Sequence, residues 1–385
     1  MRFFLLLLLI PNLLWAVPLE LSPALQSPLQ QLNNGQVLEA LDTLSELENT
    51  HLNSREYLFL KAMVKWKMMW LSTFTPKDAQ EVLDLLDEVE NICRPLLDED
   101  TDARFFYAAS IGLRAQIAAT QGDWWKTAKL GKKMKGEALL IIEKDQNYYP
   151  AYYLAGSYNY FADALPGYLK VLRAFAFLPG GDRKQGLQQL VLSYEKGGIT
   201  ESEAGQTLAI IYTYYEHNFA ESNRICEKIL SRYPLSYDTA LYKGVSLYYL
   251  KEWKEAGNWL ENLRSQILSY SSKHETSGQI VAVYQPMERE VRYWIARTLI
   301  QQQRYSEARE ILLTLANPPV HQPYWLLRAV YLSLAQIDYL NGEPGRAEGY
   351  IFRVLQWDDV KDAHEKAKKL KKKKGKVGDF DIDFL

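Results

Sequence analysis

Cysteine, histidine and long apolar stretches are scarce in this chain of 385 residues. It has two cysteines and five histidines. With so few cysteines, neither a disulfide framework nor a thiolate metal site holds the fold together. The histidines are also too scattered to give the spacing of metal ligands, so the sequence predicts no metal site and no cofactor. Their positions are His51, His217, His274, His321 and His364.

The two cysteines are expected to be unpaired core thiols. Cys93 ends the stretch 89–93 and Cys226 ends the stretch 224–226, and in both the cysteine resembles a small apolar residue on a buried helix face. An even count in an exported protein also permits one disulfide, and the sequence leaves open whether the two residues pair.

Sequence signatures of catalysis are missing. His364-Glu365 lacks the second histidine of a zinc-binding helix, and Gly156-Ser157 lacks the outer glycines of a nucleophile elbow. The stretch 180–184 resembles a phosphate loop only in composition, and a helix start capped by Asp182 explains it better. We therefore predict no catalytic residues and expect a protein that binds other molecules rather than an enzyme.

The N-terminus is typical of a cleavable export signal. An apolar run from Phe3 to Ile10 follows Arg2 and leads to the small residue Ala16. The run is well short of the roughly 20 residues of a membrane span, which favours cleavage after Ala16, or after Ala24, over a retained anchor. We predict that residues 1–16 are a signal peptide. The mature protein is then exported, periplasmic or envelope-associated, and soluble.

A period of 34 residues divides the C-terminal half of the chain. Ser222 and Ala256 occupy the same place in two successive helix-turn-helix segments. Small residues at two places of such a unit let its helices approach closely, and a proline such as Pro234 ends the second helix. The candidate packing residues in this register are Gly156, Gly186, Ser222, Gly244, Ala256, Ala308, Ala335 and Ala347.

These positions resemble the tetratricopeptide repeat (TPR) family, in an exported bacterial form, at the places that define it. Four units after about residue 180 match well, whereas the earlier units are degenerate. The resemblance implies an all-α fold, an α-solenoid of stacked TPR-like helix pairs with an apolar insertion helix. Strand signals are absent. Residues 149–190 are also weakly similar to exported repeat proteins near the tetratricopeptide domain 39 family, which implies no established chemistry.

Four regions are expected along the chain. After the signal peptide, residues 17–148 form degenerate helical repeats, and residues 149–357 form TPR-like repeats with an insertion at 161–179. A Lys-rich extension and an acidic-aromatic tail occupy 358–385. The apolar insertion is expected to cover the solenoid surface, and a membrane interface or a partner groove is the alternative. Residues 269–285 are expected to form a loop.

The Lys-rich extension is expected to be a solvated, frayed end of the last helix. Residues 361–376 contain nine lysines and only two acidic residues, Asp362 and Glu365. Runs of one charge usually lie on a solvated surface and keep the end of a repeat array soluble. The alternative is attachment to anionic lipid headgroups.

Tyrosine is abundant, with 26 residues, and several recur at fixed places in the units. In TPR folds the first helix of each unit faces a concave groove, and large amphipathic rings there suit peptide recognition. Packing between adjacent first helices is the alternative. By this resemblance the candidate groove residues are Tyr153, Tyr160, Tyr214, Tyr248, Tyr293 and Tyr339.

The function predicted from these features is a non-catalytic scaffold or adaptor of the bacterial cell envelope, which holds a protein or peptide partner in its groove. The first alternative is a peripheral membrane-associated assembly factor that docks through residues 165–178 and the basic tail. An envelope enzyme is a weaker alternative. No nucleic acid partner is expected, because an exported protein rarely meets one and no aromatic residue interrupts the lysine run.

Overall fold

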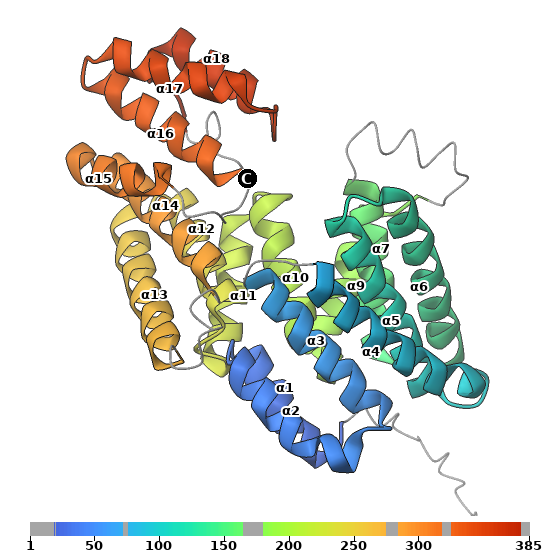
Figure 1. Cartoon of the computed structure of the whole chain (residues 1–385). Coiled ribbons are helices and arrows are strands. Elements are labelled where there is room, and N and C mark those ends of the chain that lie inside the picture. The colour runs from blue at the N-terminus through green and yellow to red at the C-terminus, as the bar shows by residue number, and fades with distance from the viewer. Residues whose placement is uncertain are drawn as a thin grey trace, which may run out of the picture.

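A computed structural model of the chain describes residue 19 and residues 21–71, 76–164, 180–274, 284–317 and 325–378. All regular structure in these segments is helical, with 17 α-helices, two short 3₁₀ helices and no strand (Figure 1). No helix among them is long and apolar enough to cross a membrane. The predicted signal peptide and the core of the predicted insertion, residues 165–179, lie outside the described residues.

Successive helices form pairs, and each pair packs against the next. The predicted all-α solenoid of TPR-like helix pairs is therefore confirmed, and it extends over the degenerate N-terminal half. The pairs are α1 (Pro23–Asn33) with α2 (Val37–His51), α3 (Arg55–Leu71) with α4 (Pro76–Cys93), α5 (Thr101–Thr120) with α6 (Trp124–Lys144), α7 (Tyr149–Ala164) with α9 (Arg183–Lys196), α10 (Glu201–Tyr214) with α11 (Phe219–Arg232), α12 (Tyr237–Tyr249) with α13 (Trp253–Lys273), α14 (Gln285–Gln301) with α15 (Tyr305–Ala316), and α16 (Leu326–Leu340) with α17 (Pro344–Gln356), followed by α18 (Ala363–Lys373).

Short polar side chains start several of these helices. The carboxylate of Asp100 accepts a hydrogen bond from the Ala103 N–H at 3.0 Å, and Asp182 accepts one from the Gln185 N–H at 2.9 Å. Such a bond satisfies one of the backbone donors that a helix start leaves without an internal partner. The prediction that Asp182 caps a helix is confirmed.

The small residues of the repeat register lie where the two helices of a pair touch. A Cβ atom added to Gly186 would lie 2.5 Å from the Tyr160 backbone nitrogen, and one added to Gly156 would lie 3.0 Å from the Gly186 carbonyl oxygen. Gly244 faces Leu260 in the same way. The other five have no exposed surface: Ser222, Ala256, Ala308, Ala335 and Ala347.

We expect Gly186→Ala to destabilise the protein by about 1–3 kcal/mol, because the new methyl group would overlap backbone atoms that cannot rotate away. A matched control is Gly136→Ala on α6, where an added Cβ meets no atom within 4 Å. That change should stabilise the protein by about 0.5–1 kcal/mol through helix propensity. Urea denaturation measures both changes, and two shifts of the same sign would contradict the helix contact.

The array curls back on itself, so that α1, α2 and α3 meet the region of α12–α14 (Figure 1). The Leu235 N–H donates to Asn34 Oδ1 at 2.9 Å, and the Tyr284 N–H donates to the Leu71 carbonyl oxygen at 2.7 Å. The Tyr284 hydroxyl donates to the Gly35 carbonyl oxygen. We call these three hydrogen bonds the closure contact.

Three buried tyrosines support the closure contact. The rings of Tyr237 and Tyr284 meet edge to face with centroids 5.0 Å apart, and Tyr270 meets Tyr284 at 5.6 Å. The Tyr270 hydroxyl donates to Glu39 Oε2 on α2 at 2.6 Å. Edge-to-face pairs add to the stability that burial provides, so this contact is part of the core.

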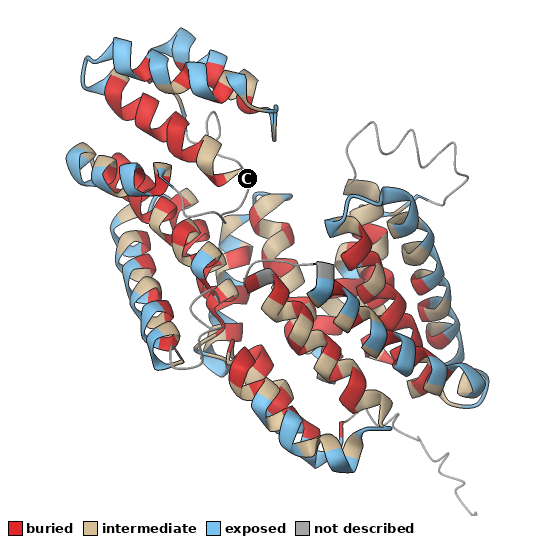
Figure 2. Cartoon of the chain, in the orientation of Figure 1, coloured by how far each residue is buried: buried red, intermediate tan, exposed pale blue. Residues whose placement is uncertain are grey.

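The C-terminal extension is a packed helix, and the prediction of a frayed end is wrong for its described part. Ala363, Ala367 and Leu370 of α18 are fully buried against the last pair. These residues follow the i, i+4, i+7 spacing of one helix face, which the many lysines concealed in the sequence. The lysines lie mostly on the exposed outer face (Figure 2), and Lys371 Nζ lies 3.3 Å from Glu348 Oε2.

The predicted loop at 269–285 is also wrong at its start, because α13 continues to Lys273. Residues 275–283 of that prediction lie outside the described residues. Ser271 and Ser272 therefore belong to a long helix that carries Tyr270 to the closure contact.

Both cysteines are free and fully buried, as the sequence favoured. Burial raises the pKa of the Cys93 thiol and that of the Cys226 thiol to about 12. Since the thiolate is the reactive form, both residues act as packing groups in the native protein.

Candidate binding surface inside the superhelix

Polar side chains from five first helices converge on the inner side of the curled array. All of them keep partial exposure although helices surround them. We call this group the inner cluster. Its members are Lys67 of α3, Tyr153 of α7, Glu203 and Tyr214 of α10, Asp238 and Tyr242 of α12, and Glu290 of α14.

Lys67 connects the two halves of the array within the inner cluster. It forms an ion pair with Asp238, and the two side chains are 26% and 19% exposed. Burial lowers the pKa of Lys67, but the charges of Asp238 and Glu203 outweigh it and raise the pKa above its ordinary value. The lysine is therefore charged near neutral pH.

The carboxylates of the inner cluster outnumber its cations. Burial raises the pKa of Glu203, and Asp238 adds to this effect while Lys67 opposes it. Burial also raises the pKa of Glu290 to about 7, with Lys361 opposing and Asp238 reinforcing the shift. A raised pKa means that the charged form lacks the solvation it has in water. An added cation would therefore stabilise both ionised carboxylates.

Aromatic rings line the same surface. Tyr214 and Tyr242 meet edge to face, with ring centroids 5.9 Å apart and planes at 87°. Burial raises the pKa of both hydroxyls well above the usual value, so both stay protonated and can donate hydrogen bonds. Rings beside carboxylates suit a cationic side chain, which the ring faces also attract.

Three of the six tyrosines predicted to face the groove are fully buried instead. The Tyr160 hydroxyl donates to Glu216 Oε1 at 2.8 Å, and the Tyr248 hydroxyl accepts from Arg297 Nη2 at 2.9 Å. Tyr293 packs edge to face against Trp325, with centroids 5.8 Å apart. These side chains fill the contacts between neighbouring helices, so the packing alternative holds for them and the groove prediction is corrected there.

The other three predicted tyrosines keep partial exposure, and their role in binding stays a prediction. Tyr153 and Tyr214 belong to the inner cluster. Tyr339 on α16 instead lies against the end of α18, where a Cβ added to Gly375 would lie 2.7 Å from the Tyr339 Cβ. The structure therefore brings together two of the six predicted residues and separates Tyr339 from them.

The charged members of the inner cluster were not predicted from the sequence. Lys67 lies in a degenerate unit, and its neighbours come from helices far apart in the chain. One signal was present. Asp238 stands eighteen positions before Ala256, and Glu290 stands eighteen positions before Ala308, the small residues in the first turns of the second helices. A recurring acidic residue at one place of a unit was available evidence for a charged inner surface.

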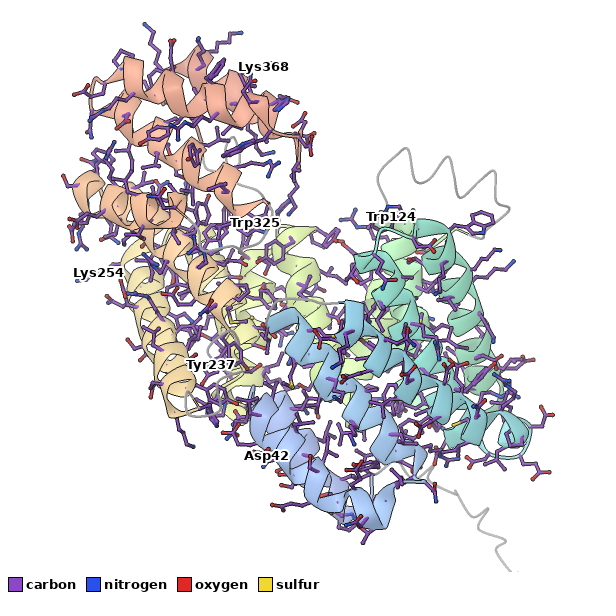
Figure 3. All side chains as sticks on the ribbon, viewed as in Figure 1. Asp42, Trp124, Tyr237, Lys254, Trp325 and Lys368 are labelled. Atoms are coloured by element: carbon purple, nitrogen blue, oxygen red, sulfur yellow. The ribbon has the colours of Figure 1, made fainter. Side chains whose placement is uncertain are left out.

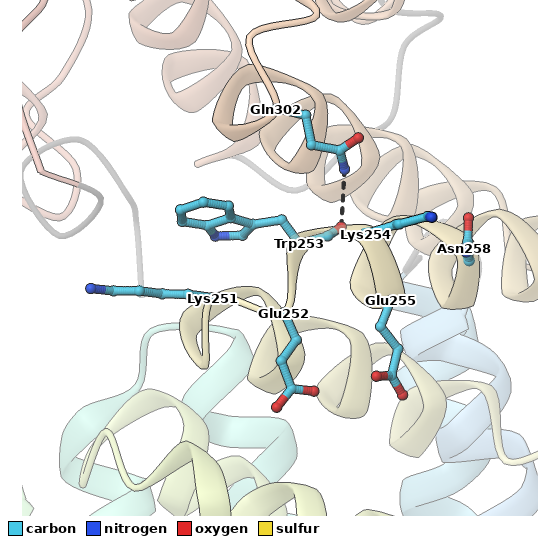
Figure 4. Close-up of a pocket in the computed structure, with 7 residues that line it drawn as sticks. All are labelled: Lys251, Glu252, Trp253, Lys254, Glu255, Asn258 and Gln302. Atoms are coloured by element: carbon cyan, nitrogen blue, oxygen red, sulfur yellow. Dashed lines mark hydrogen bonds between the residues drawn. The ribbon is translucent and has the colours of Figure 1, made fainter.

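A shallow depression of about 560 Å³ lies elsewhere, at the turn between α12 and α13 (Figure 4). Gln302 Nε2 donates to the Trp253 carbonyl oxygen there at 3.1 Å. In Figure 4 the Lys251 side chain points away from those of Glu252 and Glu255, which extend to one side of the turn. The depression is open to solvent, so it is a poorer binding site than the inner cluster. In the described part of the chain, no group of three acidic, histidine or cysteine residues is placed to hold a metal ion.

No protein-family model matches this chain, and no curated protein matches it in sequence. Among solved structures, a human IFIT1 dimer with m7Gppp-AAAA has 13% identity and a TM-score of 0.46, over 91% of this chain and 84% of its own. The C-terminal part of a TPR repeat-containing protein from Cytophaga hutchinsonii has 12% identity and a TM-score of 0.33, over 76% and 94%. The APC/C hetero-tetramer Cut9-Hcn1 has 12% identity and a TM-score of 0.25, over 92% and 91%. At such low TM-scores nothing about a ligand follows, and the TPR-like character rests on the helix pairs described above.

Proposed function

We propose that this protein is a non-catalytic scaffold of the bacterial cell envelope that holds a basic protein segment against its inner cluster. The observation that carries the proposal is the convergence of Glu203, Asp238 and Glu290 on one partly buried surface, where these three carboxylates outnumber the neighbouring cations Lys67 and Lys361. The export signal predicted at residues 1–16 supports the envelope location.

A basic peptide fits this surface better than an acidic one. A lysine or arginine side chain would stabilise the ionised forms of Glu203 and Glu290, whose charges are poorly solvated. Tyr214 and Tyr242 would contact the aliphatic stem and the charged head of the same side chain. A nucleic acid would instead bring phosphates toward three carboxylates, which is unfavourable.

We expect the mature chain to prefer Lys- and Arg-rich peptides, and to bind them more tightly as the pH rises from about 6 to about 8. Glu290 has a pKa of about 7, so it is largely neutral at the lower pH and ionised at the higher one. A peptide array with matched basic, neutral and acidic sequences identifies the charge preference. Fluorescence anisotropy with one basic peptide then measures the pH dependence.

The decisive variants replace glutamates of the inner cluster by glutamine, which removes the negative charge and keeps the shape of the side chain. Glu203→Gln/Glu290→Gln should weaken binding of the basic peptide by at least about tenfold. Glu290→Gln alone should reduce the pH dependence, and the remainder would come from Glu203, whose pKa is also raised. The matched control is Glu88→Gln/Glu143→Gln, which neutralises two exposed carboxylates on outer helices. Equal losses in both double variants, or no charge preference on the array, would refute the proposal.

A further inference from the structure

The outer helix α6 begins with two exposed tryptophans. Trp124 is 48% exposed and Trp125 is 52% exposed. Figure 3 places Trp124 at the end of its helix, on the outside of the molecule. Tryptophan is usually well buried in proteins, so two adjacent exposed rings require an explanation. They do not belong to the inner cluster, because α6 is the second helix of its pair and faces outward.

Lysines follow these rings along α6 without any acidic residue between them. Residues 124–136 contain five lysines and no aspartate or glutamate. Two of them have side-chain hydrogen-bond partners: Lys133, itself exposed, donates from Nζ to the Tyr107 hydroxyl at 2.7 Å, and Lys135 Nζ donates to Asn159 Oδ1 at 2.6 Å.

The other three lysines of this stretch are exposed. Lys126, Lys129 and Lys132 form no ion pair within the described segments. The Lys129 ammonium lies 4.8 Å from the centroid of the Trp125 ring. Their charges therefore face solvent beside the indoles.

The exposed residues form one continuous face. Trp125, Lys129 and Lys132 follow the i, i+4, i+7 spacing of a helix stripe. Further along the helix, the exposed large apolar side chains are Leu139 at 43% and Leu140 at 49%, and the exposed carboxylate of Glu143 ends the stripe. Indole rings, lysines and leucines on one helix face are the composition of helices that lie in a membrane interface.

We propose that this face of α6 docks the protein on the surface of an anionic lipid bilayer. The lysines would lie among the headgroups, and the indoles would lie at the boundary with the acyl chains. The exposed carboxylates Asp84 and Asp87 on the outer helix α4, and Asp123 and Glu143 at the two ends of α6, would be repelled by anionic lipid. The contact is therefore limited to the central part of α6 and its tryptophans, and it is shallow and sensitive to salt.

The test is flotation of the mature full-length chain with phosphatidylcholine vesicles that contain or lack phosphatidylglycerol. We expect binding only to the anionic vesicles and release in high salt. Brominated lipid should quench part of the tryptophan fluorescence. Lys129→Glu/Lys132→Glu should lower the partition coefficient by at least about tenfold. Trp124→Ser/Trp125→Ser should lower it as well and abolish the quenching.

A matched control is Lys368→Glu/Lys372→Glu, which reverses two exposed lysines on α18 and should bind like the native chain. Circular dichroism checks that each variant stays folded. Binding to neutral vesicles, equal losses in the control, or no binding to anionic vesicles would overturn the proposal. A dimer that Lys129→Glu/Lys132→Glu dissociates would overturn it too, because the face would then contact protein. These outcomes are independent of basic-peptide binding at the inner cluster.

Discussion

Replacing Gly35 by alanine is expected to destabilise the protein by about 2–4 kcal/mol and to separate the first helix pair from α12–α14. Gly35 has a φ of +75°, a conformation that costs alanine about 1–2 kcal/mol. The added methyl group would also overlap the carbonyl oxygen of Leu235, which is backbone and is held by the closure contact. Urea denaturation measures the loss in the free energy of unfolding, and small-angle X-ray scattering should detect a larger radius of gyration.

Gly122→Ala is the matched control for this change. Gly122 also has a φ of +75°, but a Cβ added there meets no atom within 4 Å. Gly122→Ala therefore has the free-energy cost of a positive φ but no overlap between the new methyl group and other atoms. If Gly35→Ala is no less stable than Gly122→Ala, the closure contact contributes nothing in solution.

The closure contact also determines the shape of the proposed binding surface. Lys67 comes from α3 and its ion-pair partner Asp238 comes from α12, so the two meet only when the array is closed. Opening the array would leave Asp238 and Glu203 without their neighbouring cation. Peptide binding by Gly35→Ala would then differ from that of the native chain, whereas Gly122→Ala would bind like the native chain.

The stacked helix pairs were predictable from the sequence because the packing that defines them is local. Gly156 and Gly186, or Ser222 and its repeat equivalent Ala256, reflect contacts within one pair or between adjacent pairs. The closure was not predictable, since it joins Asn34 to Leu235. It depends on a small rotation from each pair to the next, added over the whole array, and no single residue pattern encodes that sum.

The candidate site was predicted only in part for the same reason. The register places residues on a helix face but does not say how closely neighbouring first helices approach, so Tyr248 and Tyr293 were expected in the groove and are buried. Glu290 was missed because a single glutamate on a helix usually lies in solvent. Its raised pKa arises from helices that the sequence does not place beside it.

Leu370→Asp is expected to destabilise the protein by about 3–5 kcal/mol, because it would place a carboxylate without a partner in the contact between α18 and the last helix pair. Leu370 is fully buried there together with Ala363 and Ala367. Terminal repeats need a cap with a polar outer face, and α18 supplies apolar residues on one side and lysines on the other. Without α18, the side of the last pair that it covers would be exposed to water.

The matched control is Lys368→Asp, which introduces the same residue into the same helix at an exposed position and should change stability by less than about 1 kcal/mol. Thermal unfolding followed by circular dichroism compares the two variants. A large fall in Tm for Leu370→Asp alone would establish α18 as the cap of the array. Equal, small effects would mean that the lysine-rich segment is solvated in solution, and the free energy of unfolding would then have no contribution from it.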